Sequence, residues 1–401
     1  MKSMVEADKP LANWDIFCAV IDNYGDIGVT WRLAKQLTNE YQINVTLWVD
    51  DLKSFSHILP SLDPELASQV QHGVTINLWS NPLAICFSCP DVIIEAFACN
   101  LPDNVVKIMH DQHQAFKNDL SKIKAPVWLN LEYLSAESWV EGCHGLPSMQ
   151  NNGLKKNFYF PGFTAKTGGL ICEKDVLNQR QEWQNSPHYR KQLFDKLGLK
   201  DITSNDTVIS VFSYETPALL ALCNLWMQSN TPVHVLIPKG RSLNSLQPLL
   251  PCSIEDLKSG QQIKHGYLTL HILPMTDQQG FDELLWSCDF NIVRGEDSFL
   301  RAQWAAKPFI WHIYPQDDDY HLVKLDAFLD VYCSELTKDA GEIYQNLNIA
   351  FNEDNQENTL QAWKNLTNAM PELSKNAKQW PINALNDADL ASRLVQFVKN
   401  S

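Results

Sequence analysis

The pattern of apolar and polar positions divides the first half of the chain into alternating strands and helices. Nearly continuous apolar runs predict strands at residues 15–21, 45–49, 74–79, 91–97 and 126–131. Between the first two runs, residues 29–37 place apolar side chains at helical spacing. Strands that are apolar on both faces and separated by helices are typical of a parallel sheet covered on both sides. The first half therefore predicts a Rossmann-like domain.

The same alternation restarts after a polar stretch at residues 172–206. Further strands are predicted at 207–212, 233–237, 268–273, 290–293 and 309–313, and a short amphipathic helix at 388–398. We therefore expect an N-terminal domain at 1–175, a linker at 176–205, a C-terminal domain at 206–375, and a helical segment at 376–401 that packs back on the first domain. Two Rossmann-like domains place an active site in the cleft between them, where the strands end. The length of 401 residues suits this α/β organisation.

Composition and charge exclude several other classes of protein. The net charge of −15 argues against nonspecific nucleic-acid binding, which needs clustered Lys and Arg. The N-terminus lacks the pattern of a signal peptide, and no apolar run is long enough to cross a bilayer. The ten cysteines are scattered, and the lone pair Cys86 and Cys89 has no partner pair at metal spacing. We expect a cytoplasmic protein that binds neither nucleic acid nor a membrane.

Two carboxylates, Asp22 and Asp26, follow the first predicted strand. Loops at the carboxyl end of a doubly wound sheet usually carry function. The glycines here are spaced G-x-x-G, which is not the dinucleotide fingerprint, so an NAD enzyme loses its main support. Paired carboxylates in a cleft can hold a cation and accept a proton. Residue types alone leave a structural alternative open, in which Asp26 caps the following helix and Asp22 ends the strand.

A second loop, from Arg294 to Ser298, joins a predicted strand to a helical pattern. A helix start offers free backbone N–H groups and a positive dipole end, which suit a diphosphate. Gly295 permits close approach of the backbone, and Arg294 adds positive charge. Two interpretations of Glu296 and Asp297 stay open at this point. They are either acids favoured by the helix dipole, or groups that bind sugar hydroxyls or a cationic acceptor while backbone N–H groups hold the phosphates.

Several segments of the chain resemble the bacterial protein-arginine rhamnosyltransferases that modify translation elongation factor P, the EarP family. They are, in chain order, WDIFCAVIDNYGDIGVTWRL (14–33), NLEYLSAE (130–137), FPGFTAKTGGL (160–170), RGEDSF (294–299) and WHIYPQ (311–316). These blocks follow the order of the family and, with their surroundings, cover the chain from Trp14 to Leu325. The resemblance is strongest in the block that contains the second loop.

The resemblance implies a GT-B glycosyltransferase, in which two Rossmann-like domains face each other across a cleft. It implies transfer of L-rhamnose from dTDP-β-L-rhamnose to one arginine of elongation factor P, with inversion at the anomeric carbon. The C-terminal domain would bind most of the donor, and the N-terminal domain would bind the protein acceptor. No metal and no cofactor other than the donor substrate are implied.

The resemblance also implies roles for individual residues. Asp26 matches the catalytic base, Asp22 matches a carboxylate that holds the acceptor arginine, and Glu296 matches an essential carboxylate in the cleft. The donor contacts match Tyr214, Gln278, Arg294, Gly295, Asp297 and Ser298, of which Asp297 and Ser298 would lie at the diphosphate. At Met275 this chain departs from the family, which often has an aromatic residue there near the thymine. Phe212 is the candidate replacement, and the thioether of Met275 can still contact a ring.

This chemistry suits an acidic cleft, because a guanidinium is a poor nucleophile with a pKa above about 12. Carboxylates can bind the cation, fix its plane and take up its proton as the C–N bond forms. Two other functions remain open: a GT-B enzyme with a lipid or small-glycan acceptor, and a noncatalytic nucleotide-binding regulator of translation. The sequence shows no basic or amphipathic membrane-docking surface of the kind that lipid-modifying enzymes carry.

Overall fold

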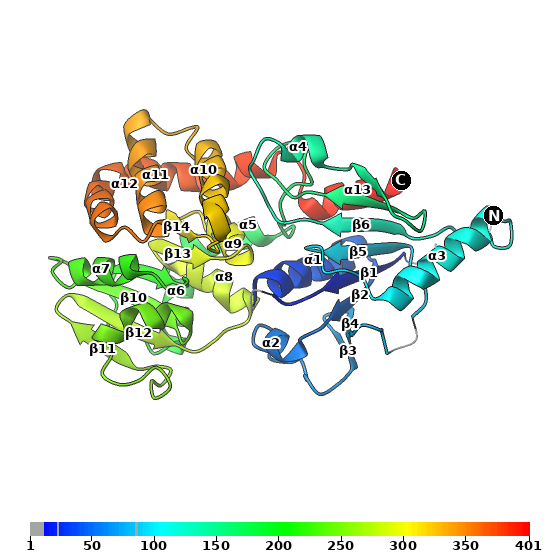
Figure 1. Cartoon of the computed structure of the whole chain (residues 1–401). Coiled ribbons are helices and arrows are strands. Elements are labelled where there is room, and N and C mark those ends of the chain that lie inside the picture. The colour runs from blue at the N-terminus through cyan, green and yellow to red at the C-terminus, as the bar shows by residue number, and fades with distance from the viewer. Residues whose placement is uncertain (1–11, 22–23, 85–86) are drawn as a thin grey trace, which may run out of the picture.

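The structure, a computed structural model, describes residues 12–21, 24–84 and 87–401. Two α/β domains lie side by side, the N-terminal one in blue and cyan and the C-terminal one in green to orange (Figure 1). Each domain is built on a mainly parallel sheet, so the prediction of two Rossmann-like domains is confirmed.

The N-terminal sheet has the strand order β3-β4-β2-β1-β5-β6-β8-β7. Its strands are β1 (Asn13–Cys18), β2 (Asn44–Val49), β3 (Ser68–Gln71), β4 (Val74–Leu78), β5 (Val92–Ala96), β6 (Val127–Leu131), β7 (Pro147–Met149) and β8 (Lys155–Tyr159). Its helices are α1 (Gly25–Tyr41), α2 (Leu52–Ser56), α3 (Asp103–Lys117) and α4 (Val140–Cys143). The order of the strands reverses between β1 and β5, which makes the end of β1 a topological switch point.

The C-terminal sheet repeats this arrangement in the order β11-β12-β10-β9-β13-β14. Its strands are β9 (Thr207–Val211), β10 (Val233–Pro238), β11 (Gln262–His265), β12 (Leu268–Leu273), β13 (Phe290–Arg294) and β14 (Phe309–His312). Its helices are α7 (Pro217–Trp226), α8 (Gln278–Ser287), α9 (Asp297–Trp304), α10 (Tyr320–Tyr332), α11 (Lys338–Asn352) and the 3₁₀ segments η1 (Arg241–Leu249) and η2 (Asp317–Asp319). The switch point lies between β9 and β13, where the loop from Arg294 to Ser298 follows β13.

The predicted strands match the observed strands closely in position, because each central strand is apolar on both faces. β5 and β13 are buried along their whole length. The pattern missed β3, β7, β8 and β11, which lie at or beside the sheet edges. β3, with the sequence SQVQ, alternates exposed and half-buried residues and pairs antiparallel with β4. Edge strands of this kind contain no continuous apolar run for the sequence to display.

The segments between and after the two sheets join the domains. Helices α5 (Val176–Asn185) and α6 (Pro187–Lys196) occupy the predicted linker and pack against α8, where the Trp183 indole N–H donates to Ser287 at 2.9 Å. Helix α12 (Gln356–Leu385) continues across the expected boundary at residue 375. Helix α13 (Leu390–Lys399) lies on the N-terminal domain, and its Leu390 N–H donates to the Leu170 carbonyl at 2.8 Å (Figure 1).

Candidate active site

The loop after β1 leads into α1, and its carboxylate Asp26 is the second residue of that helix. Tyr24 occupies the N-cap position and the helix has no side-chain cap bond, so the interpretation of Asp26 as a helix cap is wrong. The buried Asp26 carboxylate accepts the Ile21 backbone N–H at 3.1 Å and the Tyr133 hydroxyl at 3.0 Å. Asp22 lies outside the described residues.

The loop after β13 turns sharply at Gly295, whose φ of +61° favours glycine. Glu296 follows at the N-cap position of α9, but its side chain makes no cap bond. The carboxylate instead reaches the other domain and accepts the Leu134 backbone N–H at 2.9 Å. Burial raises the pKa of Glu296 to about 7, opposed by Lys324 and by the Leu134 hydrogen bond. The interpretation of Glu296 as an acid favoured by the dipole of α9 therefore does not explain why its side chain contacts the other domain.

Two consecutive residues, Tyr133 and Leu134, hold the carboxylates of both loops. Tyr133 donates its hydroxyl to Asp26, and the N–H of Leu134 donates to Glu296. The Tyr133 ring is stacked on Phe97 with 4.4 Å between ring centroids. The loop after β6 thus brings the carboxylates of the two domains to one place. The sequence reasoning missed Tyr133 as a site residue, although it belongs to the block NLEYLSAE and follows a predicted strand.

A lysine of the C-terminal domain lies beside these carboxylates. The Lys324 ammonium is 5.6 Å from the centroid of the Tyr133 ring, within the range of a cation–π contact. Burial lowers the pKa of Lys324, and the charges of Glu296 and Glu137 oppose that shift. The place where both domains meet therefore already accommodates a cation over an aromatic face between carboxylates.

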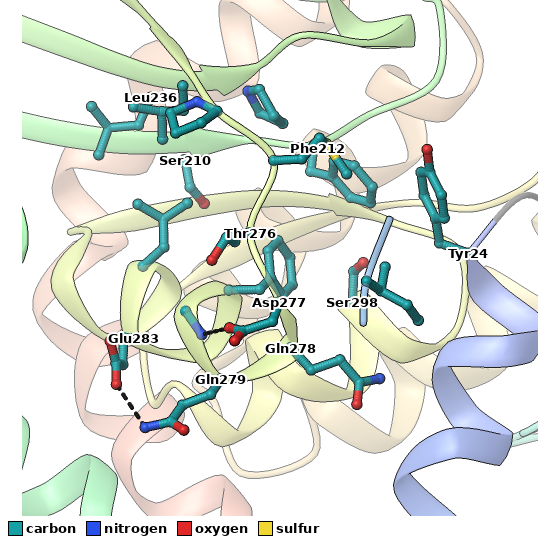
Figure 2. Close-up of a pocket in the computed structure, with 18 of the residues that line it drawn as sticks. Tyr24, Ser210, Phe212, Leu236, Thr276, Asp277, Gln278, Gln279, Glu283 and Ser298 are labelled. Atoms are coloured by element: carbon teal, nitrogen blue, oxygen red, sulfur yellow. Dashed lines mark hydrogen bonds between the residues drawn. The ribbon is translucent and has the colours of Figure 1, made fainter. Parts of the chain in front are cut away.

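A cavity of about 530 Å³ opens between the two domains next to these loops. From the N-terminal domain it is lined by Tyr24, Gly25, Ile58 and Pro60. From the C-terminal domain, the lining includes residues predicted to bind the donor, together with Met275: Phe212, Met275, Gln278, Arg294, Gly295, Asp297 and Ser298. In Figure 2, Tyr24 and Phe212 lie at the same end of this cavity, and Ser298 lies between them and Gln278. The cavity is of the size that small-molecule ligands occupy in proteins.

The wall of the cavity near Arg294 is aromatic and positively charged. The Arg294 guanidinium carbon lies 4.6 Å from the centroid of the Phe212 ring and 4.8 Å from that of Tyr214. Tyr214 is 1% exposed and lies behind Arg294, outside the set of residues that line the cavity. The structure thus brings Phe212 and Arg294 to the cavity surface and places Tyr214 as support beneath them.

Two helices begin at the floor of the cavity. α9 begins at Asp297, followed by Ser298, and α8 begins at Gln278 after the cap residue Asp277. The Asp277 carboxylate accepts the Gly280 N–H at 2.8 Å (Figure 2). The Gln278 side chain donates to the Gly28 carbonyl at 2.9 Å, so it contacts the other domain. A helix start with open backbone N–H groups is suited to phosphate.

Other features of the described chain bear on which chemistry the site supports. No group of three or more His, Cys, Asp or Glu side chains within residues 12–21, 24–84 and 87–401 is placed to hold a metal ion. Among these same residues, no helix combines the length and the apolar character needed to cross a bilayer. Of the pair Cys86 and Cys89, Cys86 lies outside the described residues, and Cys89 is partly buried.

Comparison with known proteins covers nearly the whole chain. The family model described as elongation factor P (EF-P) rhamnosyltransferase EarP matches residues 14–399. A relative from Shewanella oneidensis, named protein-arginine rhamnosyltransferase, is 62% identical over 97% of this chain and 98% of its own length. A relative of the same name from Pseudomonas putida is 46% identical over 97% of this chain and 99% of its own length.

One solved structure is similar in both sequence and fold. It concerns EarP-mediated arginine glycosylation of translation elongation factor EF-P, and it is 34% identical to this chain. The match covers 97% of this chain and 99% of the chain in the solved structure, with a TM-score of 0.68. Together with the two facing parallel sheets, this match confirms the GT-B glycosyltransferase fold that the resemblance implied.

Proposed function

The chain belongs to the EarP family of EF-P rhamnosyltransferases, and we propose that it transfers L-rhamnose from dTDP-β-L-rhamnose to one arginine of EF-P with inversion of the anomeric carbon. The proposal extends the family assignment to a donor, an acceptor and a stereochemical course. A cytoplasmic location, expected from the scattered cysteines, remains a prediction.

The main support for the proposal is that Asp26 and Glu296 are hydrogen-bonded to two adjacent residues, Tyr133 and Leu134. These carboxylates come from opposite domains, so a bound guanidinium would contact both sides of the cleft. Lys324 supports the cationic character of the acceptor, because its ammonium already lies over the Tyr133 ring. A cationic side chain entering this place would meet the same acidic surroundings, next to the Lys324 ammonium that already lies over the Tyr133 ring.

The proposed reaction is a single displacement. A guanidinium nitrogen of the acceptor attacks the anomeric carbon as the bond from that carbon to the dTDP oxygen breaks. The nitrogen gives up a proton to Asp26, and the bonding pair leaves with dTDP. One attack on the face opposite the leaving group inverts the anomeric carbon, converting the β-linked donor to an α-linked product. Glu296 holds the acceptor cation, and Asp22 is assigned to the same role by the family resemblance.

The departing diphosphate gains negative charge, which the C-terminal domain is suited to stabilise. The start of α9 at Asp297 and Ser298 presents backbone N–H groups to the cavity, and Arg294 lines the same wall. We assign the thymine to the end of the cavity formed by Phe212 and Met275, with Gln278 at the start of α8. No step in this scheme requires a metal ion or a further cofactor.

The test incubates the full chain with dTDP-rhamnose and EF-P and measures the intact mass of EF-P. We expect a gain of one deoxyhexose, mapped to an arginine by peptide sequencing, with an α linkage by NMR. Transfer only to a lipid or glycan would favour the alternative acceptor, and donor binding without any transfer would favour a noncatalytic regulator.

The Asp26→Asn variant tests the base within the same assay. We expect transfer to fall by roughly a thousandfold, because the amide cannot accept the proton, while dTDP binding stays close to wild type. Asp111→Asn, which changes an exposed aspartate of α3, is the matched control and should keep full transfer. Full activity of Asp26→Asn would overturn the assignment of the base.

A further inference from the structure

Arg32, in the middle of α1, crosses from the N-terminal domain into the C-terminal domain. Its side chain is 3% exposed, and its Nε–H donates to the Asp297 carboxylate at 2.6 Å. The two terminal nitrogens of the same guanidinium donate to the two oxygens of Asp282, each at 3.1 Å. One buried arginine of the N-terminal domain therefore binds the first residue of α9 and a residue of α8 together.

Arg32 is part of a larger buried ionic cluster. Arg301 donates to the two oxygens of Asp282 at 2.9 and 2.6 Å, and to Glu173 at 2.6 Å. Arg32 also reaches Glu173 at 3.4 Å. The cluster contains two guanidinium groups and three carboxylates, and the charge of the nearby Lys35 ammonium acts on the same three carboxylates. Removal of Arg32 would take away the guanidinium that pairs with Asp297 and leave Arg301 and Lys35 near the three carboxylates.

The two domains also touch directly at this point. A Cβ atom at Gly28 would lie 3.2 Å from both Cβ and Oδ2 of Asp297, so α1 approaches the start of α9 as closely as side chains allow. The Gln278 amide donates to the Gly28 carbonyl at 2.9 Å, which ties the start of α8 to the same turn of α1. The helix starts at the floor of the cavity are therefore both anchored to α1.

We propose that Arg32 is a positioning residue for the donor diphosphate, acting through the side chain of Asp297. This inference rests on the proposed function, because it takes dTDP as the ligand of the cavity. Arg32 binds the Asp297 carboxylate, turns it toward α1 and compensates its charge. The backbone N–H groups of Asp297 and Ser298 are then presented to the diphosphate without a facing negative charge. An aspartate at a phosphate-binding helix start thereby becomes compatible with an anionic ligand.

Electrostatics gives the reason for this assignment. A carboxylate a few ångströms from a diphosphate repels it, and the repulsion is large where the surroundings exclude water. A charge-assisted bond of 2.6 Å to a buried guanidinium is short for its type and holds the carboxylate in one orientation. Because Arg32 belongs to the N-terminal domain, the donor site is complete only when the two domains are in contact.

The test measures the affinity of the full chain for dTDP and for thymidine by titration calorimetry. For Arg32→Met we expect the dissociation constant of dTDP to rise by roughly 10- to 100-fold, because Asp297 then faces the diphosphate without its guanidinium partner. Thymidine carries no phosphate, so its affinity should change less than about threefold. Adding Asp297→Asn to Arg32→Met should restore most of the dTDP affinity by removing the repelling charge.

Arg301→Met is the matched control, because Arg301 is equally buried but makes its direct ion pairs with Glu173 and Asp282 and acts on Asp297 only at longer range. It should leave the ratio of dTDP to thymidine affinity near that of wild type. An equal loss in Arg301→Met, or no recovery in the double variant, would overturn the inference. Thermal unfolding of each variant shows that it is folded, and Arg32→Gln, which also removes the charge but stays polar, serves in place of Arg32→Met if that variant does not fold.

The titration distinguishes an error in the role of Arg32 from an error in the proposed function. If the wild-type chain does not bind dTDP, the proposed donor is wrong and the role of Arg32 fails with it. If the wild-type chain binds dTDP and Arg32→Met binds it equally well, only the role of Arg32 is wrong. Neither result depends on the identity of the acceptor, because no acceptor is present in the titration.

Discussion

Two partly buried glutamates at the domain interface, Glu296 and Glu173, differ in the groups that oppose their charge. Burial raises the pKa of Glu296 to about 7, because it outweighs the charge of Lys324 and the hydrogen bond from the Leu134 backbone N–H. Burial also disfavours the charge of Glu173, but Arg301 and Arg32 outweigh it and lower its pKa to about 2. Glu173 has its guanidinium partners within the chain. Glu296 is suited to receive one from a substrate.

The comparison extends to the two ends of the interface. Near Glu173, arginines of both domains fill an ionic cluster that joins α1 to α8 and α9. Near Glu296, the neutral groups of Tyr133 and Leu134 donate to carboxylates from both domains. The first end is a permanent contact between domains, and we interpret the second as the place where the acceptor completes the contact. The predictions below test that difference.

For the comparison of the two glutamates, the largest effect is expected from neutralising each one in turn. Glu296→Gln should lower kcat/KM for EF-P by about 100-fold, because the amide carries no charge for the guanidinium. The same change should raise the free energy of unfolding slightly, because it removes a buried charge. Glu173→Gln should instead lower the free energy of unfolding by about 2–4 kcal/mol, because it leaves buried guanidinium groups underpaired.

The measurements are steady-state kinetics with EF-P and denaturant unfolding of both variants. The opposite signs of the two stability changes are the discriminating result. If Glu173→Gln unfolds as easily as Glu296→Gln, or if Glu296→Gln retains full kcat/KM, the two glutamates do not differ as described. Glu137→Gln, near Lys324 but without a carboxylate role in the proposed reaction, is a control for a general loss of negative charge.

The pH dependence of kcat/KM should follow the ionisation of Glu296, and Glu173 should not contribute to it. Since the pKa of Glu296 is about 7, its ionised fraction rises about tenfold between pH 6 and pH 8. We expect kcat/KM for EF-P to rise over this range, and Glu296→Gln to abolish the rise. Glu173, with a pKa of about 2, stays ionised throughout.

The free energy of unfolding should fall as pH rises, whereas kcat/KM should increase. The folded pKa of Glu296 lies above its unfolded value, so the native state holds the proton more tightly. The stability contributed by the neutral form is complete below the unfolded pKa of about 4.5 and is lost as pH rises toward about 7.

A pH profile of kcat/KM that is flat from pH 6 to 8 would contradict the role of Glu296 as an ionised group.

The smallest effect is expected from Tyr133→Phe, which removes the hydroxyl that orients Asp26 and keeps the ring stacked on Phe97. The loss of one hydrogen bond should lower kcat about fivefold, with little change in KM for dTDP-rhamnose. Tyr41→Phe is the matched control, because its hydroxyl bonds Ser392 at 2.7 Å away from the cavity. Equal kcat values for the two variants would show that Tyr133 does not act through Asp26.

The sequence predicted the architecture well because each central strand is a local apolar run. β5 and β13 are buried on both faces, so hydrophobic continuity alone places them in parallel sheets. The two loops were found for a similar reason, because both follow such a strand directly. Residue types alone could not choose between cap and catalyst for Asp26, since the same carboxylate chemistry serves both roles.

By itself the sequence determined two Rossmann-like domains and two acidic loops at the carboxyl ends of their strands. Only the tertiary structure decided which partner each acid meets. Asp297 pairs with Arg32 across 265 positions of sequence, and Glu296 meets Leu134 across 162. Periodicity reports which face of an element is buried, and it carries no information about contacts between elements so far apart. Those contacts depend on how the two domains pack, and they separate a neutralised acid from one that can receive a substrate cation.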